Sequence, residues 1–181
     1  LGETLKFVDG PQTDYFRSPD GSVVNNSAVI FTEVDNTKPF TFTAKVQPEF
    51  TETGTYSAGV IYAYENDTHC QKLCFEQDEY GDHRVVSVRT LGTSDDNNHQ
   101  AITAPYVYMR LSSDGTTLGS YFSEDGKIWR MARLYKNDFP EKLLIGISSQ
   151  SPKDNEHTCL FTEVSLTDKP VADFRKGNIA E

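Results

Sequence analysis

The residues best placed to do chemistry lie on one face of an expected strand, residues 69–77. Successive side chains of a strand point to opposite faces, so Leu73 and Phe75 share one face and a polar row takes the other. That polar row is Lys72, Cys74, Glu76 and Asp78. Such a mixture of a cation, a thiol and carboxylates is unusual on a plain solvent face. It predicts either a polar cluster on the floor of a groove, which binds hydroxyls or a carboxylate, or a structural charge network.

Glu76 raises the question of glycoside hydrolysis. Retaining glycosidases use two carboxyl groups about 5.5 Å apart, one as nucleophile and the other as acid and base. Asp78 shares a face with Glu76, but position 81 is glycine and Asp82 follows a Tyr-Gly turn. The second catalytic group is missing. We therefore predict no catalytic residues and keep a glycosidase as the least favoured alternative.

Lys72 and Glu76 need partners from neighbouring strands. Four residues of strand place their Cα atoms about 13 Å apart, which is too far for a direct ion pair. Arg110 and Asp95 carry suitable charges on segments expected to lie beside them. We therefore predict that Lys72, Glu76 and Arg110 converge on a concave sheet, with Asp95 as a further ligand-binding residue.

Two rings and a guanidinium form a second candidate group, Tyr106, Tyr108 and Arg110. Their parity is opposite to that of the apolar residues between them, which predicts one core face and one outward face. Flat rings pack on the apolar faces of sugars, and a planar guanidinium reaches carboxylates such as those of uronic acids. The alternative is cross-strand aromatic packing. Trp129 follows an Asp-Gly turn and is expected in the core.

Strand patterns follow one another along the chain, and no convincing helical period separates them. The expected strands are 28–34, 40–47, 56–65, 69–77, 84–91, 101–111, 117–123, 128–135, 143–149 and 158–166. Parallel pairing would need crossover helices, so this spacing indicates an antiparallel sandwich. We predict a single all-β jelly-roll domain of two antiparallel sheets over residues 1–181, with a frayed tail at 174–181.

Metal and cofactor motifs are not found in the sequence. The run Asp95–His99 offers oxygen ligands but lacks the spacing of a calcium loop, so we expect a solvated loop. His69, Cys70 and Cys74 lack the paired spacing of a zinc site. No phosphate loop or dinucleotide fingerprint is present either. We predict no metal and no cofactor.

Charge and cysteine content restrict the partners and the compartment. A net charge of −10 and a pI near 4.8 repel phosphate backbones and anionic lipid surfaces, so neither a nucleic acid nor a membrane is an expected partner. No run approaches the ~20 apolar residues of a membrane span. Three cysteines cannot all pair within the chain, and Cys70 and Cys74 lie about 13 Å apart on one strand. Free thiols and a cytoplasmic location are expected.

An ordered set of short motifs carries a resemblance to a known family. The motifs are Asp14-Tyr15-Phe16, Tyr56-Ser57-Ala58-Gly59, Lys72-x-x-x-Glu76, Val86-Ser87-Val88, Ser94-Asp95, Arg110, Tyr121-x-Ser123-x-Asp125-Gly126-x-x-Trp129, Arg133, and a Gly146 strand that ends in Ser151-Pro152. This set resembles the concanavalin-like jelly-roll family of unknown function that includes a fungal regulation-of-enolase protein and bacterial sugar-utilisation relatives. The resemblance implies the lectin/glucanase type of jelly roll.

Three hypotheses for function follow. The first is a non-enzymatic binding or regulatory protein of carbohydrate metabolism, with a groove for a sugar or sugar-derived ligand. The second, which the resemblance suggests, is a protein-interaction module that regulates a glycolytic enzyme such as enolase. The third is a glycosidase. The ligand-binding residues expected under the first are Lys72, Glu76, Asp95, Tyr106, Tyr108 and Arg110.

Overall fold

The computed structural model describes residues 3–180, and all regular structure in that range is β-strand. The strands are β1 (Leu5–Asp9), β2 (Tyr15–Arg17), β3 (Val23–Asn25), β4 (Val29–Asp35), β5 (Phe40–Pro48), β6 (Ala58–Asn66), β7 (His69–Gln77), β8 (His83–Leu91), β9 (Thr93–Ala101), β10 (Val107–Ser113), β11 (Thr117–Ser123), β12 (Arg130–Lys136), β13 (Lys142–Gln150) and β14 (His157–Thr167). No helix long and apolar enough to cross a membrane occurs in residues 3–180.

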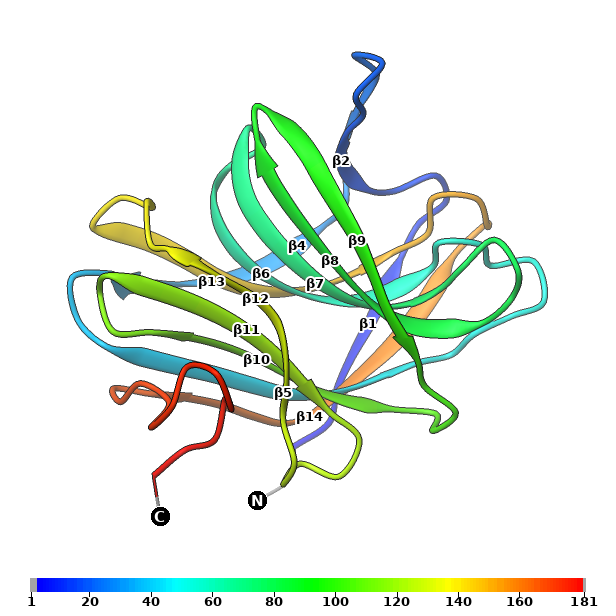
Figure 1. Ribbon diagram of the computed structural model, residues 1–181. Coiled ribbons are helices and arrows are strands. Elements are labelled where there is room, and N and C mark those ends of the chain that lie inside the picture. Colours follow the sequence, from blue (N-terminus) through cyan, green and yellow to red (C-terminus); the bar gives the residue numbers. More distant parts are fainter. Residues whose placement is uncertain (1–2, 181) are drawn as a thin grey trace.

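Two six-stranded antiparallel sheets are stacked face to face (Figure 1). The upper sheet has the order β4-β13-β6-β7-β8-β9, and the lower sheet has the order β1-β14-β5-β10-β11-β12. Strands β7, β8 and β9 curl upward, away from the lower sheet, toward the separate β2–β3 hairpin (Figure 1). The all-β fold class and its jelly-roll sandwich of two antiparallel sheets are thus confirmed.

The core lies between the sheets and follows the alternation read from the sequence. Leu73 and Phe75 of β7 are fully buried there, opposite Val107, Met109 and Leu111 of β10. Each strand therefore directs its polar parity away from the core. On β7 that parity faces the hollow of the upper sheet, whereas on β10 it faces the outer side of the lower sheet.

Strand β9 is a departure from the sequence prediction, which placed a solvated loop at Asp95–His99. Thr93–Ala101 instead pairs with β8, with Val88 opposite Asp96. Edge strands are commonly polar on both faces, because charged side chains discourage pairing with another chain. That polarity removed the apolar alternation on which the prediction depended. The short strands β1, β2 and β3 were missed as well, and the expected strand 101–111 begins only at Val107.

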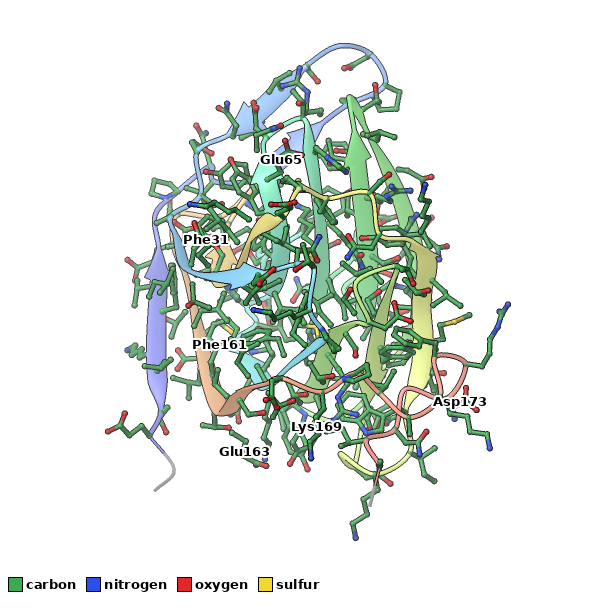
Figure 2. All side chains as sticks on the ribbon, turned by 90° about the vertical axis from the view of Figure 1, so that its left-hand side faces the viewer. Phe31, Glu65, Phe161, Glu163, Lys169 and Asp173 are labelled. Atoms are coloured by element: carbon green, nitrogen blue, oxygen red, sulfur yellow. The ribbon has the colours of Figure 1, made fainter. Side chains whose placement is uncertain are left out.

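The C-terminal segment is packed rather than frayed, so the expectation for residues 174–180 is wrong; residue 181 lies outside the described range. The Arg110 guanidinium donates to the Gly177 carbonyl at 2.6 Å, and the Tyr121 hydroxyl donates to the Phe174 carbonyl at 2.7 Å. Figure 2 shows the chain that leads into this segment, from Lys169 to Asp173, along the lower part of the molecule. It covers the outer face of the lower sheet because buried side chains there supply its hydrogen bonds.

Candidate functional site

A segment ahead of β4 forms one wall of a cleft over the upper sheet. This segment, residues 10–27, contains the β2–β3 hairpin and is called the strap here. The Arg17 amide donates to Ser94 Oγ of β9 at 3.0 Å, and the Arg17 side chain pairs with Asp67 at 3.2 Å. The Tyr15 ring lies 6.0 Å from the Tyr62 ring, edge to face. The strap is therefore anchored on both sides of the hollow that it covers.

The space between the strap and the upper sheet is a cleft of about 850 Å³. Its lining is Gln12, Asp14, Phe16, Ser18, Ser22, Val24, Tyr56, Lys72, Glu76, Glu79, Val88, Asp96, Asn98, Gln150, Pro152 and Lys153. This volume is within the range of small-molecule sites, which are concave and carry a few fixed polar groups. Lys72 and Glu76, both predicted from the sequence, lie in it.

Lys72 is a buried cation at the floor of the cleft, with 3% of its surface exposed. Its Nζ donates to Asp14 Oδ1 at 2.6 Å and to Gln150 Oε1 at 2.9 Å, and lies 5.8 Å from the centre of the Phe16 ring. Burial is the largest single influence and lowers the pKa of Lys72, but the Asp14 carboxylate together with Cys74 and Glu76 outweighs it and raises that pKa above its usual value. Lys72 is therefore charged and already paired.

Glu76 is a buried carboxyl group of the cleft that receives little hydrogen bonding from the protein. It is 8% exposed, and the hydrogen bond found for its side chain comes from Gln150 Nε2 to Oε2 at a long 3.4 Å. Burial, with the repulsion of nearby carboxylates, raises the pKa of Glu76 well above its ordinary 4.5, although Lys72 opposes the shift. Glu76 can thus offer either a proton or lone pairs to a molecule in the cleft.

Gln150 bridges Lys72 and Glu76 of the polar row. Its side chain accepts from Lys72 and donates to Glu76 and to the Tyr56 carbonyl, the last at 3.0 Å. Lys72 and Glu76 are indeed too far apart to pair directly, as their spacing predicted. The group between them comes from β13 rather than from Arg110 or Asp95.

Asp95 faces the wrong way for the cleft, so its placement with Lys72 and Glu76 is corrected. Its carboxylate pairs with Arg133 of β12 at 3.0 Å, on the side of β9 that faces the lower sheet. The next residue, Asp96, has the opposite parity and lines the cleft. Burial within the cleft raises the pKa of Asp96, while Lys72 opposes the rise. The register of β9 thus determines that Asp96, and not Asp95, faces the cleft.

Arg110 does not converge with Lys72 and Glu76, so that prediction is wrong. It lies on β10 of the lower sheet and points outward, with its guanidinium 3.6 Å from the centre of the Trp129 ring. It donates to Thr43 Oγ1 at 2.9 Å and to the Gly177 carbonyl. Burial lowers the pKa of Arg110 to about 10. Trp129 is half-buried in this stack, so the prediction that it lies in the core is wrong.

Tyr106 and Tyr108 share the outer face of the lower sheet with Arg110. Lys45 Nζ lies 3.9 Å from the centre of the Tyr106 ring, and the Tyr108 hydroxyl donates to Glu163 at 3.1 Å. The two rings contact each other edge to face at 6.0 Å. The rings therefore contact each other along one segment, and their partners from other strands are Lys45 and Glu163 rather than the aromatic rings that the alternative expected. A ligand on this face stays a prediction, separate from the cleft.

Several cleft residues were missed because they come from distant segments. Asp14 belongs to the strap, Tyr56 precedes β6, Gln150 ends β13 and Asp96 is on β9. Asp14 and Tyr56 did occur among the motifs quoted above. Tyr56 has a positive φ of 64°, which is uncommon for a residue other than glycine, and its side chain lines the cleft.

The arrangement is suited to binding a polar molecule. Within residues 3–180 no group of three His, Cys, Asp or Glu side chains is close enough to hold a metal. The cleft combines carboxyl groups with incomplete hydrogen bonding, at Glu76 and Asp96, with apolar surface from Phe16, Val24 and Val88. Cys70, Cys74 and Cys159 are free and buried thiols, as predicted.

Comparison with known proteins gives the fold and a family. A functionally unknown protein from Saccharomyces cerevisiae aligns with a TM-score of 0.82 and 23% identity, over 91% of this chain and 88% of that one. The GH43 protein BlXynB from Bacillus licheniformis aligns with a TM-score of 0.69 and 13% identity, over 91% of this chain. This chain matches only 33% of the length of that protein.

A polysaccharide lyase of family 18, aly-SJ02, has the same fold at a TM-score of 0.55 and 13% identity, with 91% of this chain and 88% of that one covered. No curated protein matches the sequence significantly. A family model described as a protein of unknown function, DUF1349, matches residues 1–169. The chain therefore belongs to the DUF1349 family of proteins of unknown function.

Proposed function

We propose that the protein is a non-enzymatic carbohydrate-binding or regulatory protein of carbohydrate metabolism, whose ligand occupies the cleft beneath the strap. The observation that carries this proposal is Glu76, a carboxyl group inside a cleft of about 850 Å³ with one long hydrogen bond to the protein. A buried polar group with spare hydrogen-bonding capacity gains free energy when a ligand supplies the missing partner.

A sugar ring matches the chemistry of the cleft because it has hydroxyl groups on its rim and apolar C–H faces. Phe16, Val24 and Val88 provide apolar surface, and Glu76 and Asp96 provide hydroxyl partners. Binding without catalysis is proposed because the segment that carries Glu76 has glycine at position 81, where the second carboxyl group of a glycosidase pair would be expected. The sandwich neighbours named as carbohydrate-active proteins share the fold, which is compatible with this proposal but does not carry it.

A glycan array followed by calorimetric titration tests the proposal. Binding of an oligosaccharide to the wild type, and its loss in Glu76→Ala, supports it. The control is Glu163→Ala, which removes an exposed carboxylate from the outer face of the lower sheet. Equal loss of binding in both variants, or no saccharide binding by the folded wild type, would contradict the proposal.

A second candidate function is a protein-interaction module that regulates a glycolytic enzyme such as enolase. The observation that favours it is the β11–β12 turn, where Ile128 is 70% exposed beside the half-buried Trp129. Aromatic residues are enriched at protein interfaces, and Ile128 extends the apolar surface next to this ring. Titration with purified enolase, comparing wild type with Ile128→Asp, decides between the candidates. Enolase binding that Ile128→Asp abolishes and Glu76→Ala leaves intact favours the interaction module.

The proposed location is the cytoplasm. All three thiols are free and buried, and free cysteines are more common in reducing compartments. A fractionation experiment that finds the protein in a secreted or membrane fraction would contradict this.

A further inference from the structure

We infer that the cleft selects neutral saccharides and rejects saccharides that carry uronate carboxylates. This inference rests on the proposed function and names the class of ligand. The first observation is the charge of the lining. Four carboxyl side chains, Asp14, Glu76, Glu79 and Asp96, face the cleft, against the two ammonium groups of Lys72 and Lys153. An anionic ligand would enter a site that already has an excess of its own charge.

The cation at the floor of the cleft is not free to receive an anion. Lys72 Nζ already donates to the Asp14 carboxylate at 2.6 Å and to Gln150 at 2.9 Å. With 3% exposure it cannot move out to meet a ligand without leaving both partners. A uronate would have to displace Asp14, which would leave that half-buried carboxylate without its cation.

No arginine contributes to the cleft lining in the described part of the chain. Arginine is the side chain whose planar donors match a carboxylate in two-point contact. Arg110, which the sequence suggested for that role, is on the other sheet and bonded to Thr43 and Gly177. The cleft thus lacks the group that most often recognises uronic acids.

The carboxyl groups that remain available favour hydroxyl ligands. Burial raises the pKa of Glu76 and of Asp96, so both resist further negative charge in their surroundings. A uronate beside them would add like-charge repulsion. A hydroxyl adds no charge, and it can accept a hydrogen bond from a neutral carboxyl group or donate one to a charged carboxylate.

The test uses matched pairs of oligosaccharides that differ only at C6, such as β-1,4-linked glucose oligomers and the corresponding glucuronate oligomers. Calorimetric titration is run on the full chain at about 0.05 M and about 0.5 M salt, because screening weakens repulsion between charges. We expect at least tenfold tighter binding of the neutral member of any pair that binds, with an affinity that does not change with salt. Equal or tighter binding of the uronate member would overturn the inference.

Two variants separate this inference from the proposed function. Asp96→Asn and Glu79→Gln remove charge at the cleft and should narrow the preference for the neutral member severalfold, mainly by improving uronate binding. Glu163→Gln, on the other sheet, should leave the preference unchanged. If neither member of any pair binds the wild type, the proposed function fails and this inference with it. If both bind and the cleft variants do not alter the preference, only the inference fails.

Discussion

The cleft and the outer face of the lower sheet each contain a buried cation next to aromatic rings, but the two regions differ in what they leave unsatisfied. Arg110 bonds to Thr43 and to Gly177 and stacks on Trp129, so its contacts all come from the protein. Lys72 is equally well paired, yet beside it Glu76 has one long hydrogen bond and an open volume in front of it.

Residue types alone do not identify a binding site. By composition, the outer face with two tyrosines and an arginine is the better sugar platform. In the structure, however, the hydrogen-bond donors of the outer face already bond to the C-terminal segment and to neighbouring side chains. The cleft retains carboxyl groups with unused hydrogen-bonding capacity. Unused capacity next to a cavity is the more useful criterion.

The largest effect is expected from removing the cation of the cleft. Lys72→Met should lower the free energy of unfolding by about 3 kcal/mol, because the half-buried Asp14 carboxylate and the buried Gln150 amide lose their shared cation. It should also weaken saccharide binding. Arg110→Met is the matched change on the other sheet and should cost about 2 kcal/mol through lost hydrogen bonds while saccharide affinity stays unchanged. Denaturant unfolding and titration of both variants check this; loss of binding in Arg110→Met would end the distinction between the regions.

A smaller effect is expected where the C-terminal segment contacts the lower sheet. Gly177 and Gly126 both have a φ of 71°, but a Cβ on Gly177 would overlap the Tyr121 ring, whereas one on Gly126 would lie 3.4 Å from the Tyr108 ring. Gly126→Ala should therefore lower the free energy of unfolding by about 1 kcal/mol, through backbone strain alone. Gly177→Ala should lower it by about 2 kcal/mol, because the overlap with the Tyr121 ring adds to that strain. Neither should alter saccharide binding. Chemical denaturation measures the difference, and equal costs would show that the overlap is relieved without penalty.

The pH dependence of stability should distinguish the cleft carboxyl from an exposed one. The pKa of folded Glu76 is raised above its ordinary value of 4.5, mainly by burial. Between 4.5 and that higher pKa the folded chain binds more protons than the unfolded chain, so the Glu76 contribution to stability falls as pH rises through this window. Glu76→Gln should thus gain stability relative to wild type as the pH rises from 4.5 to 8. Glu163→Gln serves as the control, and a Glu76→Gln difference that is flat with pH would contradict the prediction.

The smallest effect is expected from the outer-face ring. Tyr108→Ala removes a hydrogen bond to Glu163 and ring packing at a half-buried position, which should cost about 1 kcal/mol of stability. Saccharide affinity should not change. If the outer face were the sugar platform, affinity would instead fall by about 1–3 kcal/mol. Calorimetric titration of this variant therefore tests directly whether the saccharide binds in the cleft or on the outer face.

The sequence predicted the sandwich well because alternation is a local property. Leu73, Phe75 and Met109 were assigned to the core from their parity, and that assignment is confirmed. Strand β9 was missed because an edge strand with polar side chains on both faces has no such alternation.

The sequence predicted only those residues of the site that lie on a single strand. Lys72 and Glu76 share a parity on one strand, which the sequence reveals. Whether Arg110 lies on the same sheet depends on strand order, and whether Asp95 or Asp96 faces the cleft depends on the register of β9. Both are set by long-range pairing, and a one-residue change in register reverses every side chain of a strand.

The packed C-terminal segment also has a consequence for the order of folding. Its hydrogen bonds reach Arg110 on β10 and Tyr121 on β11, which lie next to each other only after those strands have paired. Its docking site therefore does not exist in the unpaired chain. Contacts of such long sequence separation form late, and φ-values for residues 174–177 should accordingly be near zero. Strengthening these contacts would slow unfolding without speeding folding.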